Sequence, residues 1–122
     1  MGGSVSHCVG VSSDLQEKGP GILFRVIKEG TIYHALMIRI NQQAKAYLNV
    51  CAHAALRLNG DRNTFFSRDG NYLYCHAHGA TYEPETGLCI RGPCEGLSLI
   101  PLTSSERDGR LYLEDETYQY YE

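Results

Sequence analysis

The chain has 122 residues and a mass of 13.6 kDa, a length that fits one domain around a single core. Its hydrophobic fraction of 43% and charged fraction of 20% are near the globular average, which excludes a disordered chain and a coiled coil. A net charge of -3 argues against a nucleic-acid partner, because non-specific affinity for nucleic acids depends on clustered Lys and Arg.

Apolar runs are too short for a membrane helix, since the longest, such as Ala35–Ile38, fall far short of the roughly 20 residues required. Residues 1–10 have neither a basic start nor an apolar run, so we expect no export signal and a cytoplasmic protein. Five cysteines in such a chain are more typical of thiols or metal ligands than of a disulfide framework.

Period-two alternation of apolar and polar residues predicts strands in chain order. A first group is expected at 22–28, 32–40 and 44–50, separated by turns at Glu29-Gly30 and Asn41-Gln42-Gln43. In the second of these, Ile32, Leu36, Ile38 and Ile40 face one way, and Tyr33, Met37 and Arg39 face the other. The only helix candidate is a turn at 14–17.

Further short strands are expected at 64–66, 71–74, 80–82, 98–102 and 110–113, each bounded by Gly, Asp, Asn or Pro. The polar residues at 61–63 and 67–70 are interpreted as a solvated hairpin with a turn at Asp69-Gly70, with a partner-docking edge as the alternative. Short strands with frequent turns predict an all-β protein, an antiparallel sandwich or a small barrel.

Two short segments carry the metal-binding chemistry. Cys51-Ala52-His53 follows the strand at 44–50, and Cys75-His76-Ala77-His78 follows the strand at 71–74. Each segment offers a thiolate and an imidazole, and the 21 residues between them allow a hairpin to bring the two loops together. Two Cys and two His suit either zinc or an iron–sulfur centre, although a zinc finger would place both Cys on one knuckle and both His on a helix.

The spacings Cys51-x-His53 and Cys75-x-x-His78 resemble the Rieske motif. In that family two Cys hold one iron of a 2Fe-2S cluster and two His hold the other. The resemblance therefore implies that Cys51, His53, Cys75 and His78 bind one 2Fe-2S cluster, and it implies no catalytic residue.

The resemblance extends to the residues around these four. Gly79 directly follows the second ligand His, and Gly92-Pro93 lies where Rieske proteins carry the loop that shields the cluster from solvent. Segment 82–87 is similar to the family's turn between the second ligand loop and that proline loop. Tyr82 matches a tyrosine whose hydroxyl reaches a ligand thiolate.

Three positions differ from the family's high-potential branch. Leu56 and Ala77 occupy the positions of two cysteines that form a disulfide in that branch, and Ala80 replaces a serine whose hydroxyl bonds to a bridging sulfide. Losing a hydrogen-bond donor to sulfur lowers the potential, so we expect the lower half of the range of about -150 to +300 mV. The chain therefore resembles a soluble, ferredoxin-type Rieske protein.

The resemblance implies a Rieske-like antiparallel β-sandwich with a small cluster-binding subdomain. We expect an N-terminal segment at 1–21, the Rieske domain at 22–113 and a C-terminal tail at 114–122. The ligand loops are expected at about 51–58 and 75–82, and the proline loop at about 89–95. The tail is expected either to fray or to pack on the sheet or at an interface.

The remaining cysteines and histidines have simpler interpretations. Cys89 and Cys94 are either buried packing thiols or a redox pair, since a disulfide needs Cα atoms about 4.4 to 6.8 Å apart. We expect an exposed thiol at Cys8, a flexible end at His7, a partly buried His34 with a hydrogen-bond partner, and a loop position near the cluster rim for His76.

These features predict an electron-transfer protein that is not itself an enzyme. It would carry one electron at a time from a reductase to an oxygenase or another terminal enzyme, with protein redox partners and no membrane span. An oxygenase would add a catalytic domain with a mononuclear iron held by two His and a carboxylate, for which we expect no room in a chain of this length. The alternatives are an accessory Rieske-like subunit of a reductase, similar to the small subunit of assimilatory nitrite reductase, and a structural zinc domain.

Overall fold

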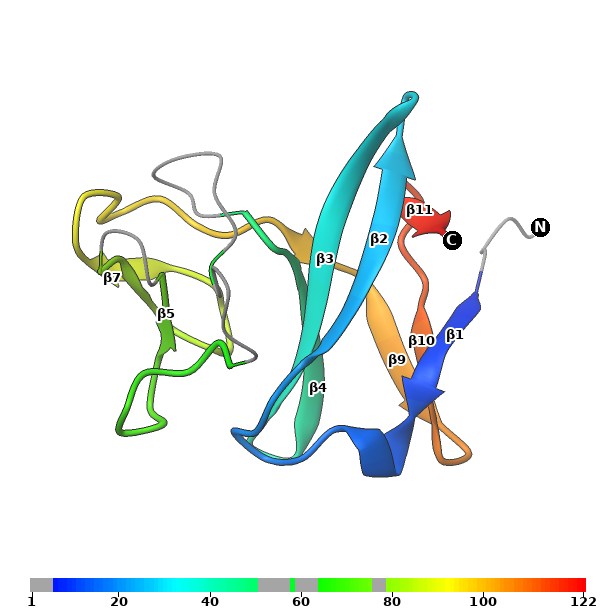
Figure 1. The fold of residues 1–122 in the computed structure, drawn as a ribbon, viewed down its shortest axis with the longest axis horizontal. Helices are drawn as coiled ribbons and strands as arrows, with labels where there is room; N and C mark the ends of the chain where they lie inside the picture. The colour runs from blue at the N-terminus through cyan, green and yellow to red at the C-terminus, as the bar shows by residue number, and fades with distance from the viewer. Residues whose placement is uncertain (1–5, 51–57, 59–63, 76–78) are drawn as a thin grey trace.

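The computed structural model describes residues 6–50, 58, 64–75 and 79–122 of the chain. Within these residues the protein is built of antiparallel strands that form three sheets, with a single 3-10 turn at Ser12–Asp14 (Figure 1). The strands are β1 (His7–Val11), β2 (Ile22–Lys28), β3 (Thr31–Ile40), β4 (Gln43–Leu48), β5 (Leu73–Tyr74), β6 (Thr81–Tyr82), β7 (Cys89–Arg91), β8 (Pro101–Leu102), β9 (Ser104–Arg107), β10 (Arg110–Leu113) and β11 (Gln119–Tyr121). The all-β fold class is confirmed.

The largest sheet has five strands in the order β11-β2-β3-β4-β8. Two tight hairpins build its centre, because the turn residues Glu29 and Gly30 and then Asn41 and Gln42 all have positive φ. Such turns match the twist of the flanking strands. The strand predicted at 44–50 begins at Gln43 and ends at Leu48 instead, because the chain turns away from the sheet at Asn49.

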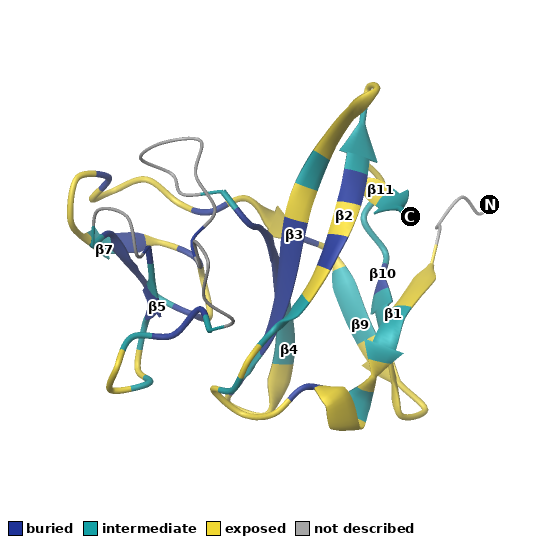
Figure 2. Ribbon diagram, in the orientation of Figure 1, coloured by how far each residue is buried: buried dark blue, intermediate teal, exposed yellow. Residues whose placement is uncertain are grey.

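Strand β3 lies between two cores. The predicted division of its side chains between two faces is confirmed, and in the middle of the strand both faces are buried, at Ala35–Ile38, while Ile32 is exposed near the hairpin turn (Figure 2). Leu36 and Ile38 pack into a core shared with the small sheet β5-β6-β7, whereas Ala35 and Met37 pack into a second core beneath β2, β4 and β10. Both faces of the sheet are therefore covered along the middle of β3.

The two chain ends belong to the sheets. Strand β1 pairs with β10, and β11 pairs with β2 at the edge of the large sheet. His7, expected in a flexible end, stacks its ring on Tyr120 with the centroids 3.8 Å apart. Tyr118 is buried and meets Tyr33 edge to face. Of the two possibilities considered for the tail, packing on the sheet is the one observed, because its tyrosines cover apolar surface.

The three-stranded sheet β5-β6-β7 lies to one side of the large sheet, on the left in Figure 1. It is preceded by the predicted hairpin, in which the backbone N–H of Ser67 donates to the oxygen of Tyr72 and Asp69-Gly70 forms the turn. The expected strand at 64–66 is reduced to a bridge between Phe66 and Leu73. Strands β7 and β9 were not predicted, since residues 89–91 and 104–107 carry no clear alternation.

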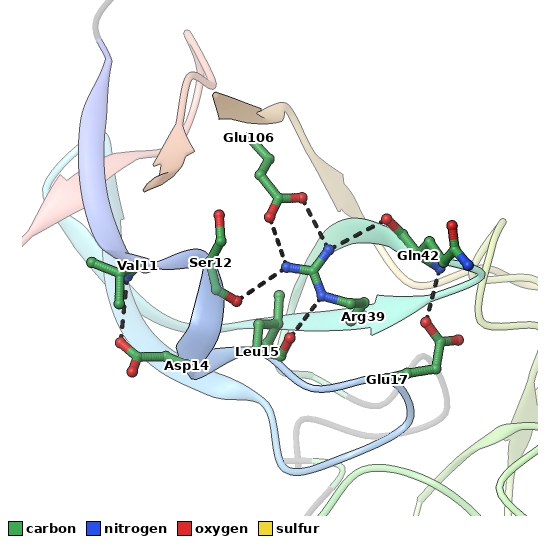
Figure 3. Close-up of polar contacts among 8 residues, drawn as sticks. All are labelled: Val11, Ser12, Asp14, Leu15, Glu17, Arg39, Gln42 and Glu106. Atoms are coloured by element: carbon green, nitrogen blue, oxygen red, sulfur yellow. Dashed lines mark hydrogen bonds and ion pairs between the residues drawn. The ribbon is translucent and has the colours of Figure 1, made fainter. Parts of the chain in front are cut away.

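Arg39 ties three parts of the chain together (Figure 3). Its guanidinium donates to both carboxylate oxygens of Glu106 on β9, with a shortest distance of 2.7 Å, and to the backbone oxygens of Leu15 and Ser12. Such bidentate pairs are strong and directional. Arg39 therefore holds both the connection before β2 and strand β9 against β3.

No helix in the described part of the chain is long and apolar enough to cross a membrane.

Candidate functional site

Of the four predicted ligands, Cys75 is the one that the structure describes. It directly follows β5, is fully buried, and belongs to the core beneath the small sheet together with Leu73 and Tyr82. Cys51, His53 and His78 lie outside the described residues, as do His76, Leu56 and Ala77. The structure therefore positions one end of the second predicted ligand loop.

Two backbone hydrogen bonds close the chain around residues 76–78. The N–H of Gly79 donates to the oxygen of Cys75 at 2.9 Å, and the N–H of Cys75 donates to the oxygen of Ala80 at 2.8 Å. Gly79 has φ +76°, a conformation that glycine adopts without cost. These bonds hold Cys75, Gly79 and Ala80, the residues on both sides of 76–78, in place. The positive φ at position 79 explains why this residue is a glycine.

Asn49 holds the two ends of the first predicted ligand loop. It is 1% exposed, its backbone N–H donates to the oxygen of His34 at 2.8 Å, and its side-chain Oδ1 accepts the N–H of Leu58 at 2.9 Å. Leu58 is fully buried. A buried amide that bridges residues nine positions apart was missed from the sequence, where its only signal is a polar residue directly after an apolar strand.

The loop that follows β7 lies against the turn after Cys75. Its base is closed by the N–H of Cys89 donating to Leu97 at 2.7 Å and by that of Gly96 donating back to Cys89 at 3.0 Å. Gly92 has φ +103°, and a Cβ added there would lie 2.9 Å from the Cα of Ala80. This close approach requires glycine, and it places the Gly92-Pro93 segment beside Gly79 and Ala80, with Pro93 exposed.

Behind this loop, Tyr82 and two thiols form a buried group. The Tyr82 hydroxyl lies 3.3 Å from Sγ of Cys94, and Sγ of Cys94 lies 2.8 Å from Sγ of Cys89. The three side chains are at most 2% exposed, and the two sulfurs are not joined in a disulfide. Tyr82, expected near a ligand thiolate, thus has Cys94 as a neighbour. Cys8 is exposed, as expected. His34, expected to be partly buried, is exposed, because it lies on the same face of β3 as Leu36 but nearer the hairpin turn, beyond the residues of β3 that join the core shared with the small sheet.

Tyr47 connects the large sheet to the segment after β6. Its hydroxyl donates to the oxygen of Pro84 at 2.8 Å, and a Cβ at Gly87 would lie 2.9 Å from its ring. Burial, together with the negative charge of Glu85 and Glu83, raises the pKa of Tyr47 to about 12. The phenol therefore stays neutral and keeps its hydrogen bond over the whole physiological pH range.

These residues fit an iron–sulfur group. The donor types in the two loops are soft thiolates and imidazoles, and Cys75 is held in an apolar core where a thiolate needs a metal to compensate its charge. Glycine at position 92 lets the Gly92-Pro93 segment lie close to the backbone of Gly79 and Ala80.

The described residues thus form an all-β fold in which Cys75 directly follows strand β5 of the small sheet. The chain matches the model of the Rieske [2Fe-2S] domain family over residues 5–101, and it belongs to this family. A Rieske domain is an electron-transfer module. A comparison with curated proteins finds no match.

Solved structures with the same fold include components of carbazole 1,9a-dioxygenase. They include the terminal oxygenases of carbazole 1,9a-dioxygenase from Novosphingobium sp. KA1 (18% identity, TM-score 0.74, covering 96% of this chain and 31% of that chain) and from Nocardioides aromaticivorans IC177 (17%, 0.74, 96% and 32%). A reduced complex between oxygenase and ferredoxin in carbazole 1,9a-dioxygenase also matches (18%, 0.73, 89% and 28%). The chain thus spans about a third of the length of these oxygenase chains, and the likeness concerns the fold.

Proposed function

We propose that the protein is a one-electron carrier of the ferredoxin type, which passes electrons from a reductase to an oxygenase or another terminal enzyme. The observation that carries this proposal is the Rieske family match over residues 5–101, a range that contains both Cys/His segments. Structures of oxygenase and ferredoxin complexes with the same fold support a protein as the redox partner.

In this proposal Cys51, His53, Cys75 and His78 hold one 2Fe-2S cluster, which supplies reversible one-electron chemistry when it is bound. Cys75 is anchored by the backbone bonds to Gly79 and Ala80 described above. The Gly92-Pro93 segment lies beside Gly79 and Ala80, and in this proposal it would shield the cluster from solvent on this side. Asn49 and Leu58 hold the ends of the segment that contains the other Cys–His pair.

Two alternatives make different predictions. A structural zinc domain would use the same four side chains and be redox-silent, and the mixed Cys–His spacing disfavours it. An accessory subunit of a reductase would not need to carry a cluster, and the presence of all four ligand residues in this chain argues against it. Both alternatives are separated from the carrier by one set of measurements.

The test is a visible and EPR spectrum of anaerobically purified protein before and after dithionite, together with iron, zinc and sulfide analysis. We expect a red-brown protein with iron and acid-labile sulfide in equal amounts, and an EPR signal that appears on reduction with an average g below that of all-cysteine clusters. Stoichiometric zinc without sulfide would overturn the proposal, as would a protein that holds no metal.

Variants test the ligand assignment. Cys51→Ser and His78→Ala should each abolish the visible spectrum, because each removes an iron ligand. Cys94→Ser is the matched control, since Cys94 is a buried thiol close to the same site that is not assigned as a ligand. Loss of the cluster in the Cys94→Ser variant, with its folding confirmed by circular dichroism, would contradict the assignment.

A further inference from the structure

We propose that Cys89 and Cys94 are a reversible dithiol–disulfide pair, a redox-modification site in the loop of residues 89–97. This site is separate from the four proposed cluster ligands, and it goes beyond the electron-carrier function. The inference uses only described residues and does not require a bound cluster.

The distance between the two sulfur atoms is the first argument. They lie 2.8 Å apart, so a bond of about 2.05 Å needs a further approach of only about 0.8 Å. Both side chains are nearly fully buried and belong to one core cluster, so they face each other in a fixed environment. Two thiols held at this distance are prepared to form a disulfide without rearrangement of the sheet.

The loop that joins the two cysteines provides the second argument. Its base is closed by the backbone bonds between Cys89 and Leu97, and the N–H of Leu97 also donates to the oxygen of Cys94 at 2.8 Å. Between Arg91 and Ser98, Cys94 is the only buried residue, and its neighbours are exposed. A small disulfide would reach Cys94 by movement of this exposed tip, which has glycines at 92 and 96, while Cys89 stays on β7.

A row of hydrogen bonds distinguishes the roles of the two thiols. The Tyr82 hydroxyl lies 3.3 Å from Sγ of Cys94, the Cys94 thiol donates to Sγ of Cys89, and the Cys89 thiol donates to the oxygen of Arg91 at 3.3 Å. A hydroxyl placed to donate to Cys94 stabilises the negative charge that this sulfur carries when it attacks. Cys94 is therefore the attacking thiol and Cys89 the resolving one.

The oxidant is a low-molecular-weight disulfide, and the exchange balances. The Cys94 sulfur loses its proton and attacks one sulfur of the small disulfide, whose S–S bond breaks and releases one small thiol. The Cys89 sulfur then attacks Cys94 in the mixed disulfide, forms the Cys89–Cys94 bond and releases the second small thiol. The two cysteines lose two protons and two electrons, and the small disulfide gains them. A small dithiol reverses the reaction.

The chain offers a direct assay, because Arg91 lies between the two cysteines and trypsin cuts after it. The purified protein is equilibrated anaerobically with oxidised and reduced glutathione at several ratios, trapped with N-ethylmaleimide under acid, digested and analysed by mass spectrometry. We expect peptides 69–91 and 92–107 to be joined in oxidising buffer and separate after dithiothreitol, with at least about a tenfold change in the joined fraction.

Variants identify the bond. The joined peptides should disappear in both Cys89→Ala and Cys94→Ala. Cys75 lies on the same tryptic peptide as Cys89, so joined peptides that persist in Cys89→Ala would assign the bond to Cys75 and would overturn the proposal. Cys8 is the internal control, since this exposed single thiol should become a glutathione adduct under the same conditions. Glutathione adducts on Cys8 with no joined peptides at any ratio would also overturn the proposal.

Two further measurements keep this inference distinct from the proposed function. The visible spectrum of each sample reports the cluster, and the joined peptides report the disulfide, so each is lost or kept independently. Because an alanine variant of a buried thiol risks poor folding, Cys89→Ser and Cys94→Ser are measured alongside by thermal unfolding. A folded serine variant in which the joined peptides persist contradicts the proposal in the same way.

Discussion

Two polar side chains, Asn49 and Tyr47, decide where the segments around the proposed site begin and end. The amide of Asn49 is hydrogen-bonded to the backbone of Leu58, and the phenol of Tyr47 is hydrogen-bonded to Pro84. Both are buried, and a buried polar group is retained only when its partner is present, since its loss leaves an unsatisfied atom. Each of these bonds therefore contributes to stability and also selects one loop arrangement.

Tyr47→Phe tests this role through alkaline stability. The folded-state pKa of Tyr47 is raised to about 12, above the ordinary tyrosine pKa of 10. Below pH 10 the phenol is neutral in both the folded and the unfolded chain, and its full stabilisation is present. This stabilisation is lost as pH rises from 10 to 12, because the phenol then ionises in the unfolded chain first. The variant should lose about 1 to 2 kcal/mol at pH 8, where Pro84 is left without its donor. It should also lose less stability than the native chain above pH 10, as measured by urea unfolding.

The other tyrosines serve as the reference, because they are present in both proteins. Equal losses of unfolding free energy in the native chain and in Tyr47→Phe between pH 10 and pH 12 would show that the phenol of Tyr47 ionises in the folded state as it does in the unfolded chain.

Among the elements, the loop after β7 contacts the chain at Gly79 and Ala80, just before β6. The two segments meet at Gly92 and Ala80, where the two backbones approach more closely than any side chain would allow. The backbone bonds from Cys75 to Gly79 and Ala80 hold one side, and the Cys89–Leu97 pairing holds the other. This contact explains why glycine is needed at position 92, independently of any resemblance.

Gly92→Ala should destabilise this contact by about 2 to 3 kcal/mol. The added Cβ has two costs: the positive φ, and a contact 2.9 Å from the Cα of Ala80. In the purified protein we expect a lower unfolding free energy and faster loss of the visible spectrum during incubation with an iron chelator.

Gly96→Ala is the matched control. Gly96 lies in the same loop with φ +93°, but a Cβ there meets no atom within 4 Å, so this variant has only the backbone cost of about 1 kcal/mol. If both variants lose the same stability and retain the cluster equally, the close approach to Ala80 has no energetic importance.

At the scale of the whole molecule, β3 is the structural centre. One face packs on the small sheet that carries Cys75, and the other packs on the core formed with β2 and β10. Arg39, near the end of the same strand, joins Glu106 on β9 and the residues before β2 (Figure 3). The proposed site and the body of the protein therefore share one rigid strand.

Arg39→Ala should lower the unfolding free energy by about 2 to 3 kcal/mol, because it removes charge-assisted hydrogen bonds to Glu106, Leu15 and Ser12. Urea unfolding at pH 7 measures this loss. The matched control is Arg68→Ala in the exposed hairpin, which should change stability by no more than about 0.5 kcal/mol.

Arg39→Ala should also change how the unfolding free energy responds to acid. The guanidinium of Arg39, with a further hydrogen bond from Ser12, lowers the pKa of Glu106 below its ordinary value of 4.5. The resulting stabilisation is present above that value and is lost as pH falls through the lowered pKa. Arg39→Ala should therefore show a smaller decrease in unfolding free energy between pH 6 and pH 3. An unchanged decrease would mean that Glu106 does not titrate against Arg39.

Prediction from the sequence succeeded where local patterns carry the information. The alternation in residues 22–40, the turn types at Glu29-Gly30 and Asp69-Gly70, and the Cys/His spacings identified the all-β class and the family. The sequence did not show that both faces of β3 are buried in its middle, and prediction failed for His7, whose stacking partner Tyr120 is more than a hundred residues away. Long-range packing of this kind has no local signal.

The sequence by itself determined the chemistry, because the ligand types, their spacing and the glycines that allow tight turns are properties of short segments. Only the tertiary structure decided which distant groups meet: Asn49 with Leu58, Tyr47 with Pro84, Gly92 with Ala80, and Cys89 with Cys94. These contacts depend on how three sheets pack around two cores. That packing is set by burial of apolar surface summed over the whole chain, a quantity that no single segment contains.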